Sequence, residues 1–462
     1  MGKRKQSSAW LYLMMGIWIA GMAAILLPCW YAGYLSRYGS ALNREARIVA
    51  LLAYAGTLLC MLRSYSALKI GWTRVSELVF SQMISCTIAA VVLYGLVSIY
   101  AHAFAVLLPL LAMLAGQLFF SVVWTLCANS LHSRKCPPVK TVIVYGRESD
   151  LHRLHAIRYF DNHFEVIRTM QEPEPDKRRF LAALDGCEAV LCAGVDERIQ
   201  NWIAKYCVER HVEAYIVPHL GDIILSGAER LSNLGLPVLR VPKERPAFCY
   251  PAVKRLMDVA LSLTALVIAS PLMLLTAAAI RCYDRGPVFY RQTRLTQDGR
   301  QFSIIKFRSM RTDAERDGVA RLASVHDDRI TPVGRFIRAT RIDELPQLLN
   351  ILAGDMSIVG PRPERPEIAA QYEKHIPEFS MRLQVKAGLT GMAQVYGRYD
   401  TDPYSKLQLD LMYINSVSLL TDLKLMFVTA KVLFMKESTT GVQEGMQSAI
   451  REERSERRDI SA

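Results

Sequence analysis

Two adjacent carboxylates, Asp343 and Glu344, stand in the run Arg338-Ala-Thr-Arg-Ile-Asp-Glu-Leu-Pro-Gln347. From Arg281 to Glu344 the chain carries 14 Lys and Arg against 9 Asp and Glu. A carboxylate beside cations is expected to have a lowered pKa and to be ionised at neutral pH. An ionised aspartate can attack phosphorus and form an acyl-phosphate. The pair indicates phosphoryl chemistry, whereas an Asp-Glu dipeptide in other surroundings is usually only solvated surface.

Five cations are candidates for binding phosphate, because a diphosphate needs several donors around it. They are Arg338, Arg362, Arg398, Lys306 and Arg308. Lys306 and Arg308 stand two residues apart in a predicted strand, so both side chains lie on one face and suit two phosphate oxygens. A solvated edge strand is the alternative. Arg362 stands between two prolines, which restrict the backbone and direct the guanidinium.

Asp343 and Glu344 also form a candidate metal site. Mg²⁺ is commonly held by one or two carboxylates together with substrate phosphates, so Glu344 could share the ion with its neighbour. The ten cysteines include no Cys-x-x-Cys pair, and neither a zinc site nor a disulfide framework is predicted.

The composition predicts a membrane protein that has soluble parts. Of the residues, 51% are hydrophobic, and the mean hydropathy is +0.15. Four apolar stretches, near 11–33, 48–68, 78–100 and 103–127, are each close to the roughly 20 residues that cross a bilayer. Lys and Arg precede the first stretch and follow the fourth, which puts both ends of the bundle in the cytoplasm. The net charge of +13 suits an anionic partner or positive-inside topology.

A fifth apolar segment, Leu256–Ile280, is interrupted by Ser270 and Pro271. Proline removes a backbone donor and kinks a helix, and a serine hydroxyl can satisfy the freed carbonyl. Lys and Arg flank both ends, so both ends prefer the cytoplasmic side. We therefore favour a re-entrant helix that enters and leaves on one face, over a fifth spanning helix.

Residues 140–242 alternate between short apolar runs and helical segments, which is the pattern of a parallel α/β sheet. Five strands are predicted, at Thr141–Tyr145, Phe164–Arg168, Glu188–Cys192, Val212–Val217 and Pro237–Val241. The first strand is followed by Gly146, without the two further glycines of a dinucleotide-binding turn. The module is interpreted as a degenerate nucleotide-binding fold with a structural or regulatory role.

Eight ordered motifs between Lys254 and Lys436 resemble those of the polyprenyl-phosphate phosphoglycosyl transferases, which are bacterial sugar transferases. The matching runs are Lys254-Arg-Leu-Met-Asp258, Ser270-Pro271, Gly286-Pro-Val-Phe-Tyr-Arg-Gln292, Lys306-Phe-Arg-Ser-Met310, Asp328-Arg-Ile-Thr331, Asp343-Glu-Leu-Pro-Gln347, Asp355-Met-Ser-Ile-Val-Gly-Pro-Arg-Pro363 and Gly388-Leu-Thr-Gly-Met-Ala-Gln-Val395. Together they are a far more specific signal than any one of them. Arg341 departs from the small residue that the family commonly has there; it either tunes the site or faces solvent.

The resemblance implies a membrane protein of α and α/β structure. Its parts would be a four-helix transmembrane bundle at 1–130, a degenerate Rossmann-like parallel α/β module at 138–245, and a monotopic α/β catalytic domain at 250–440 with the re-entrant membrane helix 256–280. A charged tail follows at 441–462. Leu419–Phe434 is predicted to be an amphipathic interfacial helix.

By the same resemblance, Asp343 is the nucleophile that attacks the β-phosphate of a UDP-sugar. UMP leaves, and undecaprenyl phosphate then takes the phosphosugar from the enzyme, which begins assembly of an exopolysaccharide, capsule or O-antigen glycan. Glu344 would help to hold Mg²⁺, while Arg338, Arg362 and Arg398 would bind phosphate; Lys306 and Arg308 are weaker candidates. The expected location is the bacterial cytoplasmic membrane, with the catalytic domain on its cytoplasmic face and no nucleic acid partner.

Two other functions remain open. A membrane-tethered nucleotide-sugar dehydratase or epimerase would need an intact glycine-rich turn and a Tyr-x-x-x-Lys pair, and neither is evident. A non-catalytic basic scaffold or regulator of polysaccharide export would tolerate replacement of Asp343. The transferred sugar is not predicted, and a homodimer built through the N-terminal half is a hypothesis.

Overall fold

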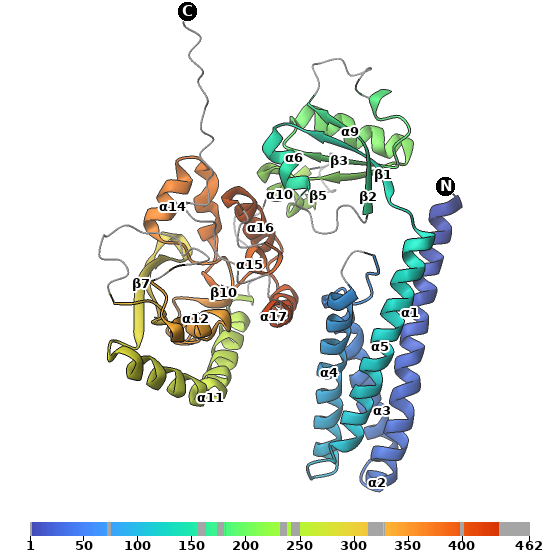
Figure 1. Ribbon diagram of the computed structural model, residues 1–462, viewed down its shortest axis with the longest axis vertical. Coiled ribbons are helices and arrows are strands. Elements are labelled where there is room, and N and C mark those ends of the chain that lie inside the picture. The colour runs from blue at the N-terminus through green and yellow to red at the C-terminus, as the bar shows by residue number, and fades with distance from the viewer. Residues whose placement is uncertain are drawn as a thin grey trace, which may run out of the picture. The chain divides into compact units, whose positions relative to one another are not determined.

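The structure is a computed structural model. It describes residues 2–71, 75–155, 163–172, 180, 182–231, 238–241, 250–312, 327, 329–397 and 402–433. The chain divides into two compact units, Met1–Pro218 and His219–Ala462, and each is described here by itself (Figure 1).

Long apolar helices form the first part of the N-terminal unit (Figure 1). They are α1 (Gly2–Pro28), which continues through a π-helical turn (Cys29–Leu35) and α2 (Ser36–Tyr38), then α3 (Arg44–Ser64), α4 (Val75–Tyr100) and α5 (Leu108–Lys135). By length and composition, the described helices include five that could cross a membrane, four of them here. Buried polar side chains pair between helices, as for Trp18 Nε1, which donates to Gln82 Oε1 at 3.1 Å.

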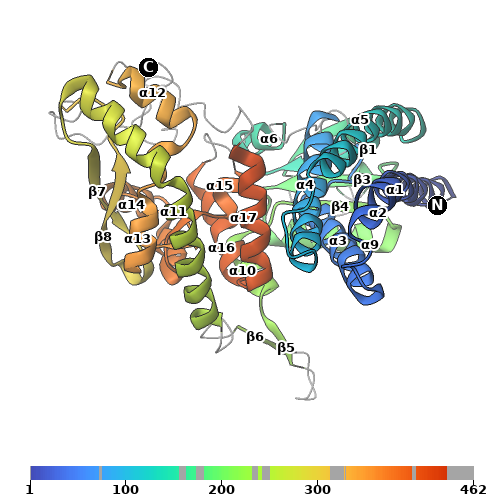
Figure 2. The ribbon, with the colours of Figure 1, turned by 90° about the horizontal axis from the view of Figure 1, so that it is seen from below.

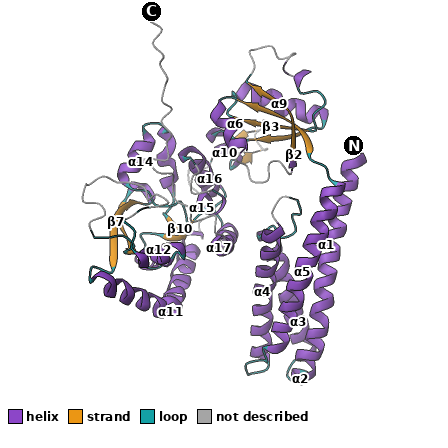
Figure 3. Cartoon of the chain, in the orientation of Figure 1, coloured by secondary structure: helices purple, strands orange, loops and turns teal. Residues whose placement is uncertain are grey.

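The sheet of the N-terminal unit has four parallel strands in the order β2-β1-β3-β4. Figure 3 draws the strands of this sheet in orange, with β2 and β3 labelled. They are β1 (Val139–Tyr145), β2 (Phe164–Gln171), β3 (Ala189–Ala193) and β4 (Glu213–Ile216), with helices α6 (Glu148–His155) and α9 (Glu197–Arg210). Val142 packs with Ile203 of α9 on one face, and Ile143 packs with Leu154 of α6 on the other. Helices on both faces explain why the central strands are continuous apolar runs. These four strands confirm the predicted parallel α/β module.

An acidic side chain lies at the carboxyl edge of this sheet. Arg147 N, in the turn after β1, donates to Asp150 Oδ2 at 3.3 Å. The same carboxylate closely approaches Gly194, which follows β3. In a sheet of this order, a ligand would bind between the ends of β1 and β3. Asp150 occupies that place and disfavours a phosphate there.

The predicted fifth strand does not join the parallel sheet. β6 (Val238–Arg240) pairs antiparallel with β5 (Glu229–Leu231) in a separate hairpin. The hairpin follows α10 (Leu220–Ser226). This helix packs on α16 (Pro403–Asn415) of the C-terminal unit, and Asn415 Nδ2 donates to the Ile223 carbonyl at 2.6 Å. Residues 219–241 thus belong to the second compact unit and not to the sheet.

The C-terminal unit is built from short elements around apolar cores. After α11 (Tyr250–Asp284) come β7 (Phe289–Leu295), β8 (Gln301–Phe307), α12 (Pro332–Ala339), a 3₁₀ turn η3 (Ile342–Glu344), α13 (Gln347–Ala353), β9 (Ser357–Val359), α14 (Pro366–Glu373), η4 (Pro377–Gln384), β10 (Gly388–Thr390), α15 (Met392–Tyr396), α16 and α17 (Leu419–Leu433). The two predicted strands β7 and β8 form an antiparallel hairpin. Asp298 and Gly299 form its turn with φ of 58° and 74°, the geometry that suits an Asp-Gly pair.

Helix α11 is continuous over 35 residues and contains Pro271. Pro271 has no N–H for the carbonyl of Val267, four residues earlier, and Ser270 Oγ donates to that carbonyl instead at 2.8 Å. The predicted compensation by Ser270 is therefore confirmed. Figures 1 and 2 show that α11 changes direction along its length, so that its two halves run as separate arms.

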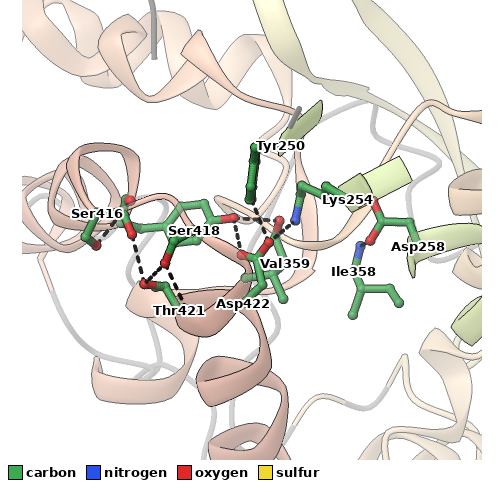
Figure 4. A network of polar contacts seen from close by, with 10 residues as sticks. Tyr250, Lys254, Asp258, Ile358, Val359, Ser416, Ser418, Thr421 and Asp422 are labelled. Atoms are coloured by element: carbon green, nitrogen blue, oxygen red, sulfur yellow. Dashed lines mark hydrogen bonds and ion pairs between the residues drawn. The ribbon is translucent and has the colours of Figure 1, made fainter. Parts of the chain in front are cut away.

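Polar side chains of the first half of α11 bind it to the rest of the C-terminal unit (Figure 4). Lys254 Nζ lies 2.8 Å from Asp422 Oδ2, whose side chain is fully buried, and Tyr250 OH donates to the same oxygen at 2.6 Å. Arg255 donates to the carbonyls that end α13, and Asp258 Oδ1 accepts from Ile358 N at 3.1 Å. The charges before the apolar segment thus have structural partners in addition to any topological role.

Candidate active site

The Asp-Glu pair is placed by a tight reversal after α12. Thr331 Oγ1 accepts from Gly334 N at 2.9 Å and caps α12, whose first residue is Pro332. Arg341 then adopts φ of 59°, a left-handed conformation that is costly for a residue with a Cβ. This reversal turns the chain into η3, where Asp343 and Glu344 lie close to β8.

Glu344 is the centre of an ion cluster. Its Oε1 lies 3.0 Å from Lys306 Nζ of β8 and 2.9 Å from Arg362 Nη2, and Arg341 Nη1 is 3.9 Å away. The Glu344 side chain is only 12% exposed. The structure thus brings together two cations that are separated by more than fifty residues of sequence, through one carboxylate.

The pKa of Glu344 follows from these contacts. Burial by itself would raise it, but Lys306, Arg362 and Arg341 outweigh burial and hold the pKa well below its usual range. Burial lowers the pKa of Lys306, while Glu344 opposes that change. At neutral pH Glu344 is therefore a fixed negative charge that balances part of the surrounding positive charge.

The pKa of Asp343 differs from that of Glu344 in direction, and the prediction that it is lowered is wrong. Its pKa is raised, first by burial and then by the neighbouring Glu344 charge, against the opposing effects of Lys306, Arg338 and Arg341. Its Oδ1 is buried without a hydrogen-bond partner among the residues that the structure describes. The cations pair with Glu344, and Asp343 keeps an uncommitted carboxylate oxygen.

The three other predicted cations, Arg338, Arg308 and Arg398, differ in their positions. Arg338, on α12, acts on Asp343 electrostatically. Arg308 lies elsewhere: its side chain is 7% exposed and pairs with Asp284 at the end of α11. Arg398 falls outside the described residues. Lys306 and Arg308 therefore contact different carboxylates, although a strand face was expected to bring them together.

Two residues at the site are not predicted from the sequence to contact it. Arg341 departs from the family pattern, and its guanidinium lies 3.9 Å from Glu344 Oε1. Arg382 belongs to no recognised motif, yet it donates to the main chain of Arg362 at 3.0 Å. Its only sequence signal was a cation in an apolar run, Phe379-Ser-Met-Arg-Leu383.

The metal hypothesis fits Asp343 better than Glu344. Uncommitted, buried Asp343 Oδ1 is the kind of hard oxygen that Mg²⁺ binds, whereas Glu344 Oε1 already contacts Lys306 and Arg362. Within the described part of the chain, no group of three or more His, Cys, Asp or Glu side chains could hold a metal. An ion here would need ligands from a bound phosphate.

A carboxylate with one free oxygen, four neighbouring cations and an adjoining bent apolar helix defines a membrane-associated class of phosphate-handling protein. A profile of the bacterial sugar transferase family matches residues 249–436. The exopolysaccharide production protein PSS of Rhizobium leguminosarum bv. phaseoli is 40% identical over 186 residues, which cover 38% of this chain and 92% of that protein. The chain belongs to the bacterial sugar transferase family.

Longer relatives match over part of their length. The UDP-glucose:undecaprenyl-phosphate glucose-1-phosphate transferase of Klebsiella pneumoniae is 42% identical over 190 residues, 40% of this chain and 41% of that protein. The UDP-N-acetylgalactosamine-undecaprenyl-phosphate N-acetylgalactosaminephosphotransferase of Aeromonas hydrophila is 36% identical over 269 residues, 58% and 62% of the two chains. The chain thus spans between 41% and 62% of these two relatives.

Proposed function

We propose that this protein transfers a sugar 1-phosphate from a UDP-sugar to undecaprenyl phosphate and releases UMP. The proposal rests on the different contacts of the two carboxylates. Asp343 Oδ1 is buried without a hydrogen-bond partner among the described residues, while Glu344 Oε1 contacts Lys306 and Arg362. The Klebsiella and Aeromonas relatives are named for reactions of this class. The product would begin assembly of a surface glycan.

In the first half-reaction, an Asp343 carboxylate oxygen forms a bond to the β-phosphorus of the UDP-sugar. The bond from that phosphorus to the bridging oxygen breaks, and the bridging oxygen leaves with its electron pair as part of UMP. A covalent phosphosugar then remains on Asp343. A raised pKa makes this carboxylate a stronger base, and hence a stronger nucleophile, when it is ionised.

In the second half-reaction, a phosphate oxygen of undecaprenyl phosphate attacks the same phosphorus. The bond from phosphorus to Asp343 breaks, which restores the free carboxylate and forms undecaprenyl-diphosphate-sugar. The atoms balance without an oxidant, a reductant or a further substrate. The acceptor and the leaving UMP both carry phosphate charge, so one cationic site can serve both halves.

The cations around the Asp-Glu pair would stabilise this charge. Lys306, Arg338, Arg341 and Arg362 surround two carboxylates, so positive charge remains after Asp343 and Glu344 are counted. The Arg362 side chain is 42% exposed, so a ligand in solution could reach it beside the Glu344 contact. Bidentate contact of such a guanidinium with phosphate adds both energy and orientation.

Mg²⁺ is proposed as the cofactor, with Asp343 as its first protein ligand and Glu344, whose Oε1 already contacts Lys306 and Arg362, as the second. When bound, the ion would neutralise charge on the diphosphate. Lys306 and Arg362 would meanwhile keep Glu344 oriented toward the site.

The membrane arrangement proposed here follows the charge pattern. Helices α1, α3, α4 and α5 would span the bacterial cytoplasmic membrane, and α11 would enter and leave its cytoplasmic face by bending at Ser270-Pro271. The two halves of the apolar segment Leu256–Ile280, on either side of the bend, are each about 10–15 residues or roughly 15–22 Å of helix, shorter than a hydrocarbon core of about 30 Å. Asp343 would then remain in the compartment that supplies nucleotide sugars.

The test is UMP release from a panel of UDP-sugars that includes glucose and N-acetylgalactosamine, with membrane-extracted protein, Mg²⁺ and undecaprenyl phosphate. One sugar should give lipid-dependent turnover, and without lipid at most one UMP per enzyme. Asp343→Asn should abolish both release and labelling of the protein by a radioactive phosphosugar. Asp298→Asn, in the hairpin turn of β7 and β8, should retain activity because Asn tolerates positive φ.

Absence of UMP from every sugar, or full activity of Asp343→Asn, would exclude this mechanism. Absence of UMP would favour a non-catalytic basic scaffold, whereas a fully active Asp343→Asn would show that the reaction does not use Asp343 as its nucleophile.

A further inference from the structure

The turn that carries Arg362 is held at every carbonyl along its length. The carbonyls of Pro361, Arg362, Pro363 and Glu364 accept, in order, from Gly388 N at 2.8 Å, Arg382 Nη2 at 3.0 Å, Arg294 Nη1 at 3.2 Å and Leu295 N at 3.0 Å. Two of these donors are main-chain amides and two are guanidiniums. The turn is therefore fixed from β10, η4 and β7 at once.

Arg382 is the most deeply buried of these side-chain anchors. Its side chain is 4% exposed, and Nη2 lies 2.7 Å from Asp410 Oδ2 on α16, which is 1% exposed. Nη1 lies 3.6 Å from Glu364 Oε1, and the guanidinium carbon is 5.0 Å from the centre of the Phe379 ring. The Arg382 side chain thus bridges α16 and the turn.

Burial of this ion pair is costly. Two charges taken out of water lose several kcal/mol of solvation, and their mutual attraction often only offsets that loss. Burial raises the pKa of Asp410 to about 6, even though Arg382 and Lys406 favour its charged form and Glu364 opposes it. Apolar residues of similar volume often stabilise a fold as well as a buried ion pair does, so a contribution to stability is a weak explanation for Arg382.

We propose that Arg382 is a positioning residue: held by Asp410, it fixes the main chain of Arg362 and so directs the Arg362 guanidinium to Glu344 and to phosphate bound beside Asp343. The inference rests on the proposed transferase function. The evidence for it is a chain of two hydrogen bonds. Arg382 Nη2 donates to the Arg362 carbonyl, and Arg362 Nη2 in turn donates to Glu344 Oε1. Arg382 itself does not need to contact substrate.

The rigid plane of the guanidinium suits this role. Arg382 Nη2 meets both Asp410 Oδ2 and the Arg362 carbonyl, while Nη1 lies 3.6 Å from Glu364 Oε1, so the group is oriented by contacts at two nitrogens. A lysine at 382 would retain the charge, but its single ammonium nitrogen on a flexible stem cannot reproduce this fixed geometry. Loss of a charged hydrogen bond that orients a catalytic-site cation predicts a decrease in kcat/KM of roughly ten-fold or more.

A double-mutant cycle tests the proposal. The variants are Arg382→Lys, Arg362→Ala and the combination, measured by UMP release with the sugar that the wild-type protein accepts. If Arg382 acts through Arg362, Arg382→Lys should lower kcat/KM strongly in the wild-type background and by less than two-fold in the Arg362→Ala background. Asp410→Asn, which retains the shape of the side chain, should behave in the same way.

The matched control is Leu411→Ala, which removes a buried apolar side chain from α16 beside Asp410. It should lower the melting temperature but leave kcat/KM of the folded protein within about two-fold. Independent losses for Arg382→Lys and Arg362→Ala would overturn the positioning role. A loss of kcat/KM in Leu411→Ala equal to that in Arg382→Lys would overturn it as well.

If Arg382→Lys does not fold, the double-mutant cycle of Asp410→Asn with Arg362→Ala tests the positioning role by itself. Failure of the wild-type protein to release UMP would reject the proposed function and this inference together. An active wild-type protein with additive variants would reject the inference only.

Discussion

Asp343 and Glu344 are adjacent in sequence but differ in their contacts. Glu344 Oε1 lies 3.0 Å from Lys306 Nζ and 2.9 Å from Arg362 Nη2, while Asp343 Oδ1 is buried with no hydrogen-bond partner within the described ranges. The two side chains leave the 3₁₀ turn in different surroundings, so the Glu344 carboxylate is fixed by cations and the Asp343 carboxylate keeps an oxygen that accepts no hydrogen bond from the described residues.

Replacement of Glu344 by Gln should change both the pH profile and the stability. The Glu344 charge raises the pKa of Asp343, so its removal should move the acidic limb of kcat/KM toward lower pH. Lys306 and Arg362 would lose their counter-charge, at a cost of about 3 kcal/mol. Activity measured across pH, together with thermal unfolding, checks this prediction. An acidic limb that stays in place would show that Asp343 does not control it.

The same charge sets a limit on acid stability. The pKa of Glu344 in the folded protein is lowered from 4.5, so its contribution to stability is complete at neutral pH and is lost as pH falls below 4.5. Glu344→Gln should therefore show less loss of stability in acid than the wild-type protein does.

Arg341→Gly should shift the acidic limb in the direction opposite to Glu344→Gln. The Arg341 cation lowers the pKa of Asp343, so its removal should move the limb toward higher pH. Glycine adopts φ of 59° without a Cβ penalty, and the folded state should change by about 1 kcal/mol or less in its favour. The pH dependence of UMP release provides the measurement. Shifts of the two variants in one direction would contradict the electrostatic account.

Pro271→Ala should straighten α11. Alanine restores the N–H that can donate to the Val267 carbonyl, which Ser270 Oγ now satisfies. Activity should fall by roughly ten-fold or more if the bend positions the site at the membrane. Pro251→Ala is the matched control, because Pro251 lies in the first turn of the same helix, where the amide has no intrahelical partner. Accessibility of single cysteines after α11 would report the change of topology; equal labelling and equal activity of both variants would count against a bend-dependent arrangement.

Asp422→Asn should destabilise the C-terminal unit. Asp422 is fully buried, and its carboxylate meets Lys254 Nζ at 2.8 Å and the hydroxyls of Tyr250 and Tyr413. Loss of its charge leaves the Lys254 ammonium without a counter-charge, which costs about 3–5 kcal/mol. Thermal unfolding of the extracted protein measures the change. Glu229→Gln is the control, because it removes only the exposed ion pair with Arg240 and should cost less than about 1 kcal/mol. Equal losses of melting temperature in the two variants would contradict the prediction.

The sequence by itself determined the elements whose signals are local. Four apolar stretches became α1, α3, α4 and α5, and apolar runs became the four strands of the parallel sheet. The Ser270-Pro271 compensation was also predictable, because proline removes a donor whose acceptor lies four residues away in the same helix. The family motifs are contiguous patterns too, and from them Asp343 and Glu344 are predicted as the catalytic pair.

Only the tertiary structure decided which charges meet. Lys306 and Arg308 are two residues apart, yet one contacts Glu344 and the other Asp284, because different elements pack on either side of the end of β8. Burial reversed the expected direction of the Asp343 pKa, and burial depends on contacts from distant segments. The contact between Arg382 and Asp410 could not be predicted either, since a buried ion pair forms between residues that no local pattern connects.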